Sequence, residues 1–232
     1  MGHLMTAIPA RMAALPRDKH GRPVPWFVLI DEHGTPDFRV IRAHGIHDAW
    51  RFRWCWTCGQ PLGRHTAFVI GPMCAVNRVT AEPPSHRECA IYSAVACPFL
   101  STPTMVRRER GLPDHVDPPG VMLLRNPGVA VVWASAGGWK PFRAGDGSGV
   151  LFDVGDPTEV LWFTHGRQAT VEEIHASINA GMPALRDVAE KQGPHAVNEL
   201  NRQVAVALRL LPAGPTNRDS LHNEQAPERK PA

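Results

Sequence analysis

Apolar runs broken by glycine and proline predict short strands along much of the chain. Residues 26–30 are apolar and residues 37–41 alternate polar with apolar positions, so with the turn residues between them they predict a β-hairpin. Further apolar runs predict six more strands, at residues 66–70, 75–80, 121–124, 129–134, 150–154 and 160–163. The strands after residue 120 are short and separated by glycine-rich turns, which indicates a small antiparallel sheet.

Apolar residues at helical spacing predict five helices, at residues 47–54, 86–96, 171–180, 184–192 and 194–211. Ser85 with Glu88, and Thr170 with Glu173, have the spacing of a capping box at the start of a helix. The sequence Gly181-Met182-Pro183 is expected to end one helix and begin the next. The pattern therefore predicts an α+β protein with three C-terminal helices.

Proline, charge and composition divide the chain into five predicted segments. These are an irregular basic arm at 1–23, a hairpin and ligand-bearing module at 24–100, a linker or wrapping loop at 101–120, a small sheet with helices at 121–211, and a disordered tail at 212–232. The tail has almost no apolar residues, which is why we expect it to be disordered.

The overall charge is nearly balanced. The 232 residues include 25 basic and 22 acidic side chains, a formal charge of +3 that does not by itself indicate a nucleic-acid partner. No apolar run approaches the roughly 20 residues that cross a bilayer, and the first residues do not resemble a signal peptide. We therefore expect a cytoplasmic, reducing location, where clustered cysteines are metal ligands more often than disulfides.

Two short pairs of metal-binding residues lie in the 24–100 segment. Cys55 and Cys58 form a CxxC pair followed by Gly59, and His86 and Cys89 form an HxxC pair at the start of a predicted helix. Two such pairs at this spacing are typical of a structural Zn²⁺ site, and a glycine after the second cysteine suits the turn of a zinc knuckle. The sequence predicts one structural zinc ion per chain in a treble-clef-like module preceded by the β-hairpin.

Several alternatives to this assignment remain open. Cys74 is an alternative fourth ligand in place of His86, and an iron–sulfur cluster is an alternative to zinc. Cys97 is read as a buried structural thiol. The His86-Arg87-Glu88 sequence matches the HxE of zinc deaminases, but those enzymes carry their CxxC after this motif, whereas here it comes before. A closed set of four protein ligands favours a structural metal over a catalytic one.

Polar residues near the predicted metal site, and in one later loop, are candidates for a binding site. They are Asn77, Arg78, Glu82, Arg87 and Arg125, together with His165 and Arg167 before the helix predicted at residue 171. The alternative interpretation is a network of ion pairs that holds loops together. Trp50, Trp54 and Trp56 with Arg51 and Arg53 form either a base-stacking surface or part of the core of a small zinc domain.

A series of specific motifs runs from the arm into the C-terminal half. They are Leu15-Pro16-Arg17-Asp18, Pro23-Val24-Pro25-Trp26-Phe27-Val28, Asp37-Phe38-Arg39-Val40, Cys55-Trp56-Thr57-Cys58-Gly59, residues 68–78, Glu82-Pro83-Pro84-Ser85-His86 with Cys89-Ala90, Cys97-Pro98-Phe99-Leu100, Arg125-Asn126-Pro127-Gly128 and Gly166-Arg167. Through these motifs, residues 8–211 resemble a set of uncharacterised bacterial and phage-associated proteins. The resemblance implies a zinc-binding protein and brings no established activity with it.

The expected function is that of a zinc-stabilised, non-enzymatic binding protein that contacts nucleic acid or a protein partner, as an accessory factor of a phage or mobile element. This expectation rests on the closed ligand set and on arginines that lie nearby in the sequence, which are Arg51, Arg53, Arg107, Arg108 and Arg110. The alternative is an enzyme, a hydrolase or nuclease-like protein, with a polar site between the zinc module and the C-terminal half.

Overall fold

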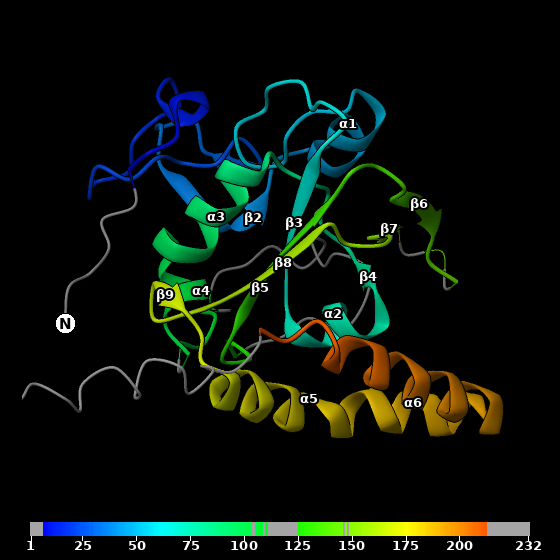
Figure 1. Cartoon of the computed structure of the whole chain (residues 1–232). Helices are drawn as coiled ribbons and strands as arrows, with labels where there is room; N and C mark the ends of the chain where they lie inside the picture. The colour runs from blue at the N-terminus through cyan, green and yellow to red at the C-terminus, as the bar shows by residue number, and fades with distance from the viewer. Residues whose placement is uncertain are drawn as a thin grey trace, which may run out of the picture.

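The structure is a computed structural model that describes residues 7–103, 105–108, 110, 125–145, 147 and 149–212 (Figure 1). Within these residues it is an α+β protein with small antiparallel sheets, as predicted, and it has six α-helices rather than the five expected. The strand predicted at residues 121–124, most of the linker and nearly all of the C-terminal tail lie outside the described residues. None of the described helices combines the length and apolar character needed to cross a membrane.

The predicted N-terminal hairpin is confirmed. Strand β1 (Val28–Ile30) pairs antiparallel with β2 (Pro36–Ile41), and the short helix α1 (Gly45–Arg51) follows. The described part of the arm, residues 7–23, is irregular apart from one 3-10 turn, η1 (Ala10–Met12). Met12 of this turn is only 1% exposed, so the arm packs onto the protein.

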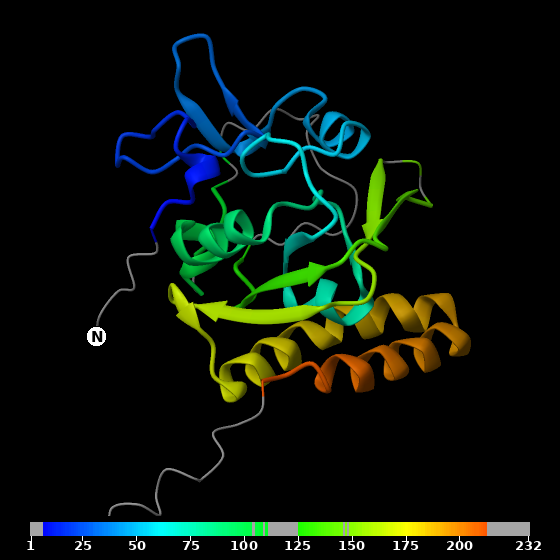
Figure 2. The ribbon, with the colours of Figure 1, turned by 45° about the horizontal axis from the view of Figure 1, so that its top comes forward.

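The main sheet has four antiparallel strands in the order β3 (Thr66–Ile70), β5 (Ala130–Ser135), β8 (Glu159–Thr164) and β9 (Arg167–Gln168). All six residues of β5 are buried because helices cover both faces of the sheet. Helix α3 (Arg87–Ala96) packs on one face. The other is covered by α2 (Pro72–Asn77) and α5 (Val171–Gln192) (Figure 2). Burial on both faces explains why β5 is a continuous apolar run rather than an alternating one.

A second sheet has the order β4 (Val79–Thr80), β7 (Val150–Asp153) and β6 (Lys140–Arg143). All four residues of β6 are exposed, so this strand has no apolar run by which the sequence could reveal it. Strands β3 and β4 come from the segment predicted as a separate zinc module, and they pair with β5 and β7 of the later segment. Both sheets are therefore shared between the two predicted halves.

The strand predicted at residues 75–80 is wrong for most of its length. The chain forms α2 there, because Pro72 occupies a first-turn position where its missing N–H costs nothing. Arg78 ends the helix in the left-handed conformation, with φ 61°, and only the two residues of β4 remain as strand.

The prediction of three C-terminal helices is also wrong, because α5 continues through Gly181 and Pro183 and is followed only by α6 (Pro194–Leu208). Helix α5 packs against α2 and α6, which offsets the backbone hydrogen bond that Pro183 cannot make. Gly181 is a point of close packing rather than a helix end: a Cβ there would lie 2.6 Å from the sulfur of Met73.

One of the two predicted capping boxes is confirmed. Thr170 and Glu173 exchange hydrogen bonds at the start of α5. The box predicted at Ser85 is wrong, because α3 begins one residue later and has His86 as its N-cap. Ser85 instead shares a hydrogen bond of 2.9 Å with the hydroxyl of Thr57, in the turn that carries the CxxC pair. Helix α3 ends at Ala96 with Cys97 as its C-cap, and the short α4 (Pro98–Ser101) follows.

Candidate metal centre

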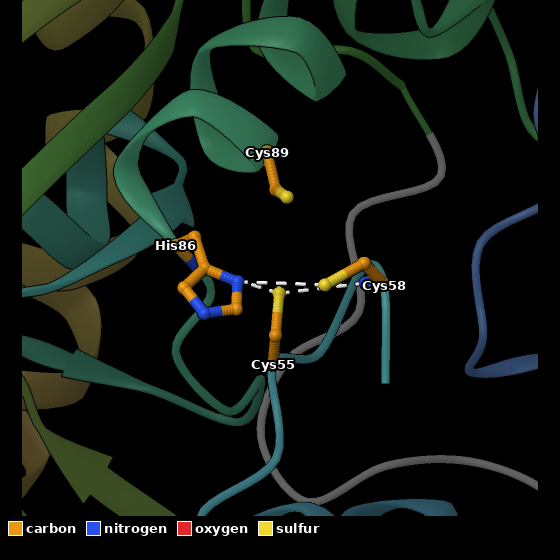
Figure 3. Close-up of side chains that lie close together, drawn as sticks. All are labelled: Cys55, Cys58, His86 and Cys89. Atoms are coloured by element: carbon orange, nitrogen blue, oxygen red, sulfur yellow. Dashed lines mark hydrogen bonds between the residues drawn. The ribbon is translucent and has the colours of Figure 1, made fainter. Parts of the chain in front are cut away.

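Four side chains meet where the turn after α1 contacts the start of α3 (Figure 3). Cys55 and Cys58 come from the turn, and His86 and Cys89 come from the N-cap and first turn of the helix. Their ligand atoms all lie within 4.8 Å of one another, and all four residues are buried. The structure therefore brings together the four ligands predicted from the sequence, in a cluster that can hold a metal ion.

Backbone hydrogen bonds shape the turn around the first cysteine. The N–H groups of Cys58 and His86 donate to Sγ of Cys55, at 3.4 and 3.3 Å. The N–H of Gly59 donates to the carbonyl of Cys55 at 2.8 Å, and Gly59 has φ +72°, a conformation that glycine adopts without strain. N–H donors to sulfur stabilise a thiolate, which is the form of cysteine that binds metal.

His86 is oriented from outside the cluster. Its Nε2 lies 3.1 Å from the carbonyl oxygen of Pro61, and its Nδ1 lies 3.4 Å from Sγ of Cys58. Because a carbonyl only accepts, Nε2 carries the proton and Nδ1 presents its lone pair to the cluster. A histidine ligand fixed by a carbonyl on its second nitrogen is the usual arrangement at protein metal sites.

The three thiols cannot all ionise without a cation. Burial opposes ionisation of Cys55, but hydrogen bonds from Cys58, Cys89 and two backbone N–H groups outweigh it and lower its pKa. The hydrogen bond to Cys55 raises the pKa of Cys58 to about 11. The pKa of Cys89 is also raised, because its hydrogen bonds to Cys55 and Cys58 favour the protonated form. A bound divalent cation removes this conflict by balancing the negative charge.

The arm forms an outer wall of the metal centre. Met12 packs with the three cysteine ligands and Tyr92 in one buried apolar cluster. Beside this cluster, Nε of Arg11 donates a hydrogen bond to the carboxylate of Glu88 at 2.9 Å. Glu88 therefore holds the arm, and does not form the capping box predicted with Ser85. The described part of the arm is thus a structural cover for the metal centre.

Cys74 and Cys97 lie apart from this cluster. Cys74 is on α2, where burial raises the pKa of its thiol to about 11. Cys97 lies at the far end of α3, and burial raises its pKa too. Within the described residues only Cys55, Cys58, His86 and Cys89 gather at ligand distance, so the candidate site includes His86 and does not include Cys74.

Most residues of the predicted polar site have local partners instead of converging. Arg78 donates to Asp156 at 2.6 Å, Arg87 to Glu159 at 2.5 and 2.8 Å, and Arg167 to Glu173 at 2.7 and 2.9 Å. The side chain of Asn77 accepts the N–H of Val79 at 3.0 Å. His165 lies on the exposed turn between β8 and β9, with φ 51°, and Arg125 is exposed beside Val106. These contacts fit the alternative interpretation, in which ion pairs hold loops together.

Glu82 differs from the other residues of this set. In the described part of the chain its carboxylate makes no hydrogen bond or ion pair. Glu82 is exposed at the surface, but desolvation by the protein around its carboxylate raises its pKa to about 7. Its negative charge also contributes to the raised pKa values of the Cys74 and Cys97 thiols.

Glu82→Gln is expected to stabilise the protein above pH 7 and to have little effect at pH 4. A raised pKa means that the folded state holds a proton which the unfolded state has already released, so stability falls as pH rises from about 4.5 to about 7. Solvent screening limits the effect to about 1 kcal/mol. Urea unfolding of both proteins across this pH range measures it, and an equal stability difference at every pH would contradict it.

The sequence prediction missed much of a surface made by arginines and aromatic rings. Arg42 lies 4.6 Å from the ring centre of Trp26, and Arg53 lies 5.3 Å from that of Trp139. Arg51 lies 5.9 Å from the ring centre of the exposed Phe52. Arg51 and Arg53 could be singled out from their local sequence. The approach of Arg42 to Trp26 and of Arg53 to Trp139 arises only on folding, because these partners are distant in sequence.

Comparison of the chain with protein-family models, with curated proteins and with solved structures finds no match in any of the three. Inferences about function therefore rest on the geometry of these residues.

Proposed function

We propose that this chain is a non-enzymatic nucleic-acid-binding protein held together by one structural zinc ion. Three thiolates and one imidazole are a common zinc ligand set, whereas iron–sulfur clusters usually take four cysteines and Mg²⁺ or Ca²⁺ takes oxygen ligands. Four protein ligands leave no position open for a substrate, so the zinc is assigned a structural role.

The order of ligands supports a treble-clef-like assignment, with a CxxC turn first and a helix that carries the second pair later. The intervening strands depart from that arrangement, because β3 and β4 pair with β5 and β7 and not with each other. The proposal therefore rests on the ligand order and on the placement of His86 and Cys89 at the start of α3.

The observation that carries the nucleic-acid proposal is a surface that we call the basic face, which consists of Arg42, Arg51, Arg53 and Arg64. All four are exposed, and none forms an ion pair among the described residues. Seven other arginines do pair with carboxylates; they are Arg11, Arg22, Arg39, Arg78, Arg87, Arg167 and Arg202. Arginines kept free of carboxylates remain available for phosphate groups.

The basic face adjoins the metal centre. Arg51 ends α1, Arg53 donates to the carbonyl of Gly63 at 3.1 Å, and Arg64 donates to that of Ala136 at 3.3 Å. These bonds join the turn that carries the first ligand pair to the segment leading into β6, where Lys140 and Arg143 are also exposed. Figures 1 and 2 show α1 and β6 on the same side of the molecule.

Removing two charges from the basic face should weaken nucleic-acid binding and its dependence on salt. Each phosphate contact contributes about 0.7 to 0.9 to the slope of log K against log salt, so Arg51→Gln with Arg53→Gln should reduce the slope by about 1.5. The matched control is Arg186→Gln with Arg209→Gln, which removes the same charge from exposed arginines in the α5–α6 layer.

Fluorescence anisotropy with labelled DNA and RNA across a salt series makes this measurement. Equal slopes for the two double variants would overturn the assignment of the basic face. Binding that is absent or independent of salt would overturn the nucleic-acid proposal and leave a protein partner as the alternative.

The hydrolase or nuclease-like alternative requires Glu82, His86 or His165 to meet an arginine in one site. His86 lies in the metal centre and His165 lies on the β8–β9 turn, and no described hydrogen bond or ion pair joins either of them to Glu82. No specific observation favours this alternative.

A further inference from the structure

We infer that the basic face binds single-stranded nucleic acid, with Phe52 as a platform on which an unpaired base stacks. This inference rests on the proposed function and specifies its ligand. It is carried by a row of three aromatic rings, Phe52, Trp54 and Trp26, that has an arginine at each end.

The rings of the row contact one another in sequence. The ring centres of Phe52 and Trp54 are 5.1 Å apart at a tilt of 33°, and those of Trp54 and Trp26 are 5.7 Å apart in an edge-to-face arrangement. Arg51 lies over Phe52 at 5.9 Å, and Arg42 lies over Trp26 at 4.6 Å. A flat apolar surface is therefore flanked at each end by a planar cation, as base stacking combined with phosphate contact requires.

Phe52 is the ring of the row that is most open to solvent. It is 52% exposed, whereas Trp54 and Trp26 are half-buried. Phe52 is the C-cap residue of α1, and the tilted indole of Trp54 supports it. A supported ring that keeps about half of its surface in water is available for contact with a base.

The metal centre fixes the other end of the row. The N–H of Trp26 donates to the carbonyl of Thr57 at 2.7 Å, within the CxxC turn. Gly59 lies directly against the Trp26 indole, since a Cβ on Gly59 would be 2.5 Å from a ring carbon. The zinc-binding turn thus sets the position of Trp26, and through Trp54 that of Phe52.

This geometry suits a single strand better than a duplex. Proteins that read duplex DNA commonly insert a helix into the major groove, and α1 has only seven residues with Asp48 in its first turn. In a duplex the faces of the bases are stacked on one another, so an aromatic ring gains nothing from them. An unpaired base has a free face, and each base stacked on an aromatic ring contributes enough affinity to be measured.

The test compares a labelled oligothymidylate with a duplex of the same length, by fluorescence anisotropy on the full chain with its metal bound. Wild type should bind the single strand more tightly. Phe52→Leu keeps the apolar bulk and removes the aromatic ring, so single-strand binding should weaken about 5- to 100-fold with an unchanged salt slope. Phe52→Trp should restore it.

Phe38→Leu is the matched control, because Phe38 is a phenylalanine that is 48% exposed on β2, outside the row. It should bind like wild type, and the zinc content of each variant checks that the turn is intact. Equal or tighter binding of the duplex would overturn this inference, and so would wild-type affinity in Phe52→Leu. If binding still depended on salt in either case, the proposed function would stand. Absence of salt-dependent binding to both probes would overturn the two together.

Discussion

Replacing Cys58 or Cys89 by serine should release the metal and unfold the part of the protein built around it. Each substitution removes one of four buried ligands and leaves the remaining cysteines with negative charge that no cation balances. Binding of structural zinc supplies on the order of 10 kcal/mol of folding free energy in small zinc domains, which is comparable with the whole stability of a typical domain. We expect zinc content to fall from one per chain to nearly none, with a loss of at least about 5 kcal/mol.

Cys97→Ser is the control for this experiment, because Cys97 lies at the other end of the same helix and outside the ligand cluster. It should keep one zinc ion and most of the stability. Metal analysis by mass spectrometry and thermal unfolding with and without a chelator make the comparison. Full zinc retention in either Cys58→Ser or Cys89→Ser would show that the ligand assignment is wrong.

Gly59→Ala should have the second largest effect, although it removes no ligand. Gly59 has φ +72°, where a side chain strains the backbone, and the added Cβ would meet a ring carbon of Trp26 at 2.5 Å. Together the strain and the overlap should cost about 2–5 kcal/mol. Because the same turn carries Cys55 and Cys58, zinc affinity should fall as well.

Gly34→Ala separates the two contributions. Gly34 has φ +78°, and no heavy atom lies within 4 Å of the position its Cβ would take. It should therefore show the backbone strain alone, about 1–2 kcal/mol. Chemical denaturation of both variants measures the difference, and an equal loss in the two would mean that the contact between Gly59 and Trp26 does not constrain the turn.

The sequence was most informative where local chemistry determines structure. The two ligand pairs could be recognised because a closed zinc site uses few residue types at short spacings. Thr170 and Glu173 formed the predicted capping box because their partners lie within the same helical turn. The apolar run of β5 predicted a buried strand because both faces of that strand contact helices.

Predictions failed where a distant contact decided the outcome. Gly181 and Pro183 usually interrupt a helix, but packing of α5 against α2 and α6 keeps it continuous. Ser85 had the sequence of a cap, but its hydroxyl pairs with Thr57, which is 28 residues away. The pairing of β3 with β5 joins residues about 65 positions apart, and no local pattern encodes it.

In the candidate binding surface, too, some features follow from local sequence and others depend on distant contacts. Arg51, Phe52 and Arg53 are adjacent in the sequence, so part of the surface could be suspected before the fold was known. The approach of Arg42 to Trp26 and of Arg53 to Trp139 depends on the tertiary fold. In the polar site predicted around Asn77 and Arg78 the converse holds, since these neighbours in sequence have hydrogen-bond partners in different places.

Zinc K-edge X-ray absorption on the purified protein tests the central claim most directly. The ligand set of Cys55, Cys58, His86 and Cys89 predicts one zinc ion per chain with three sulfur neighbours at about 2.3 Å and one nitrogen at about 2.0 Å. Four sulfur neighbours would mean that another cysteine displaces His86. A bound oxygen, or a metal other than zinc, would contradict the closed structural site from which the proposed function starts.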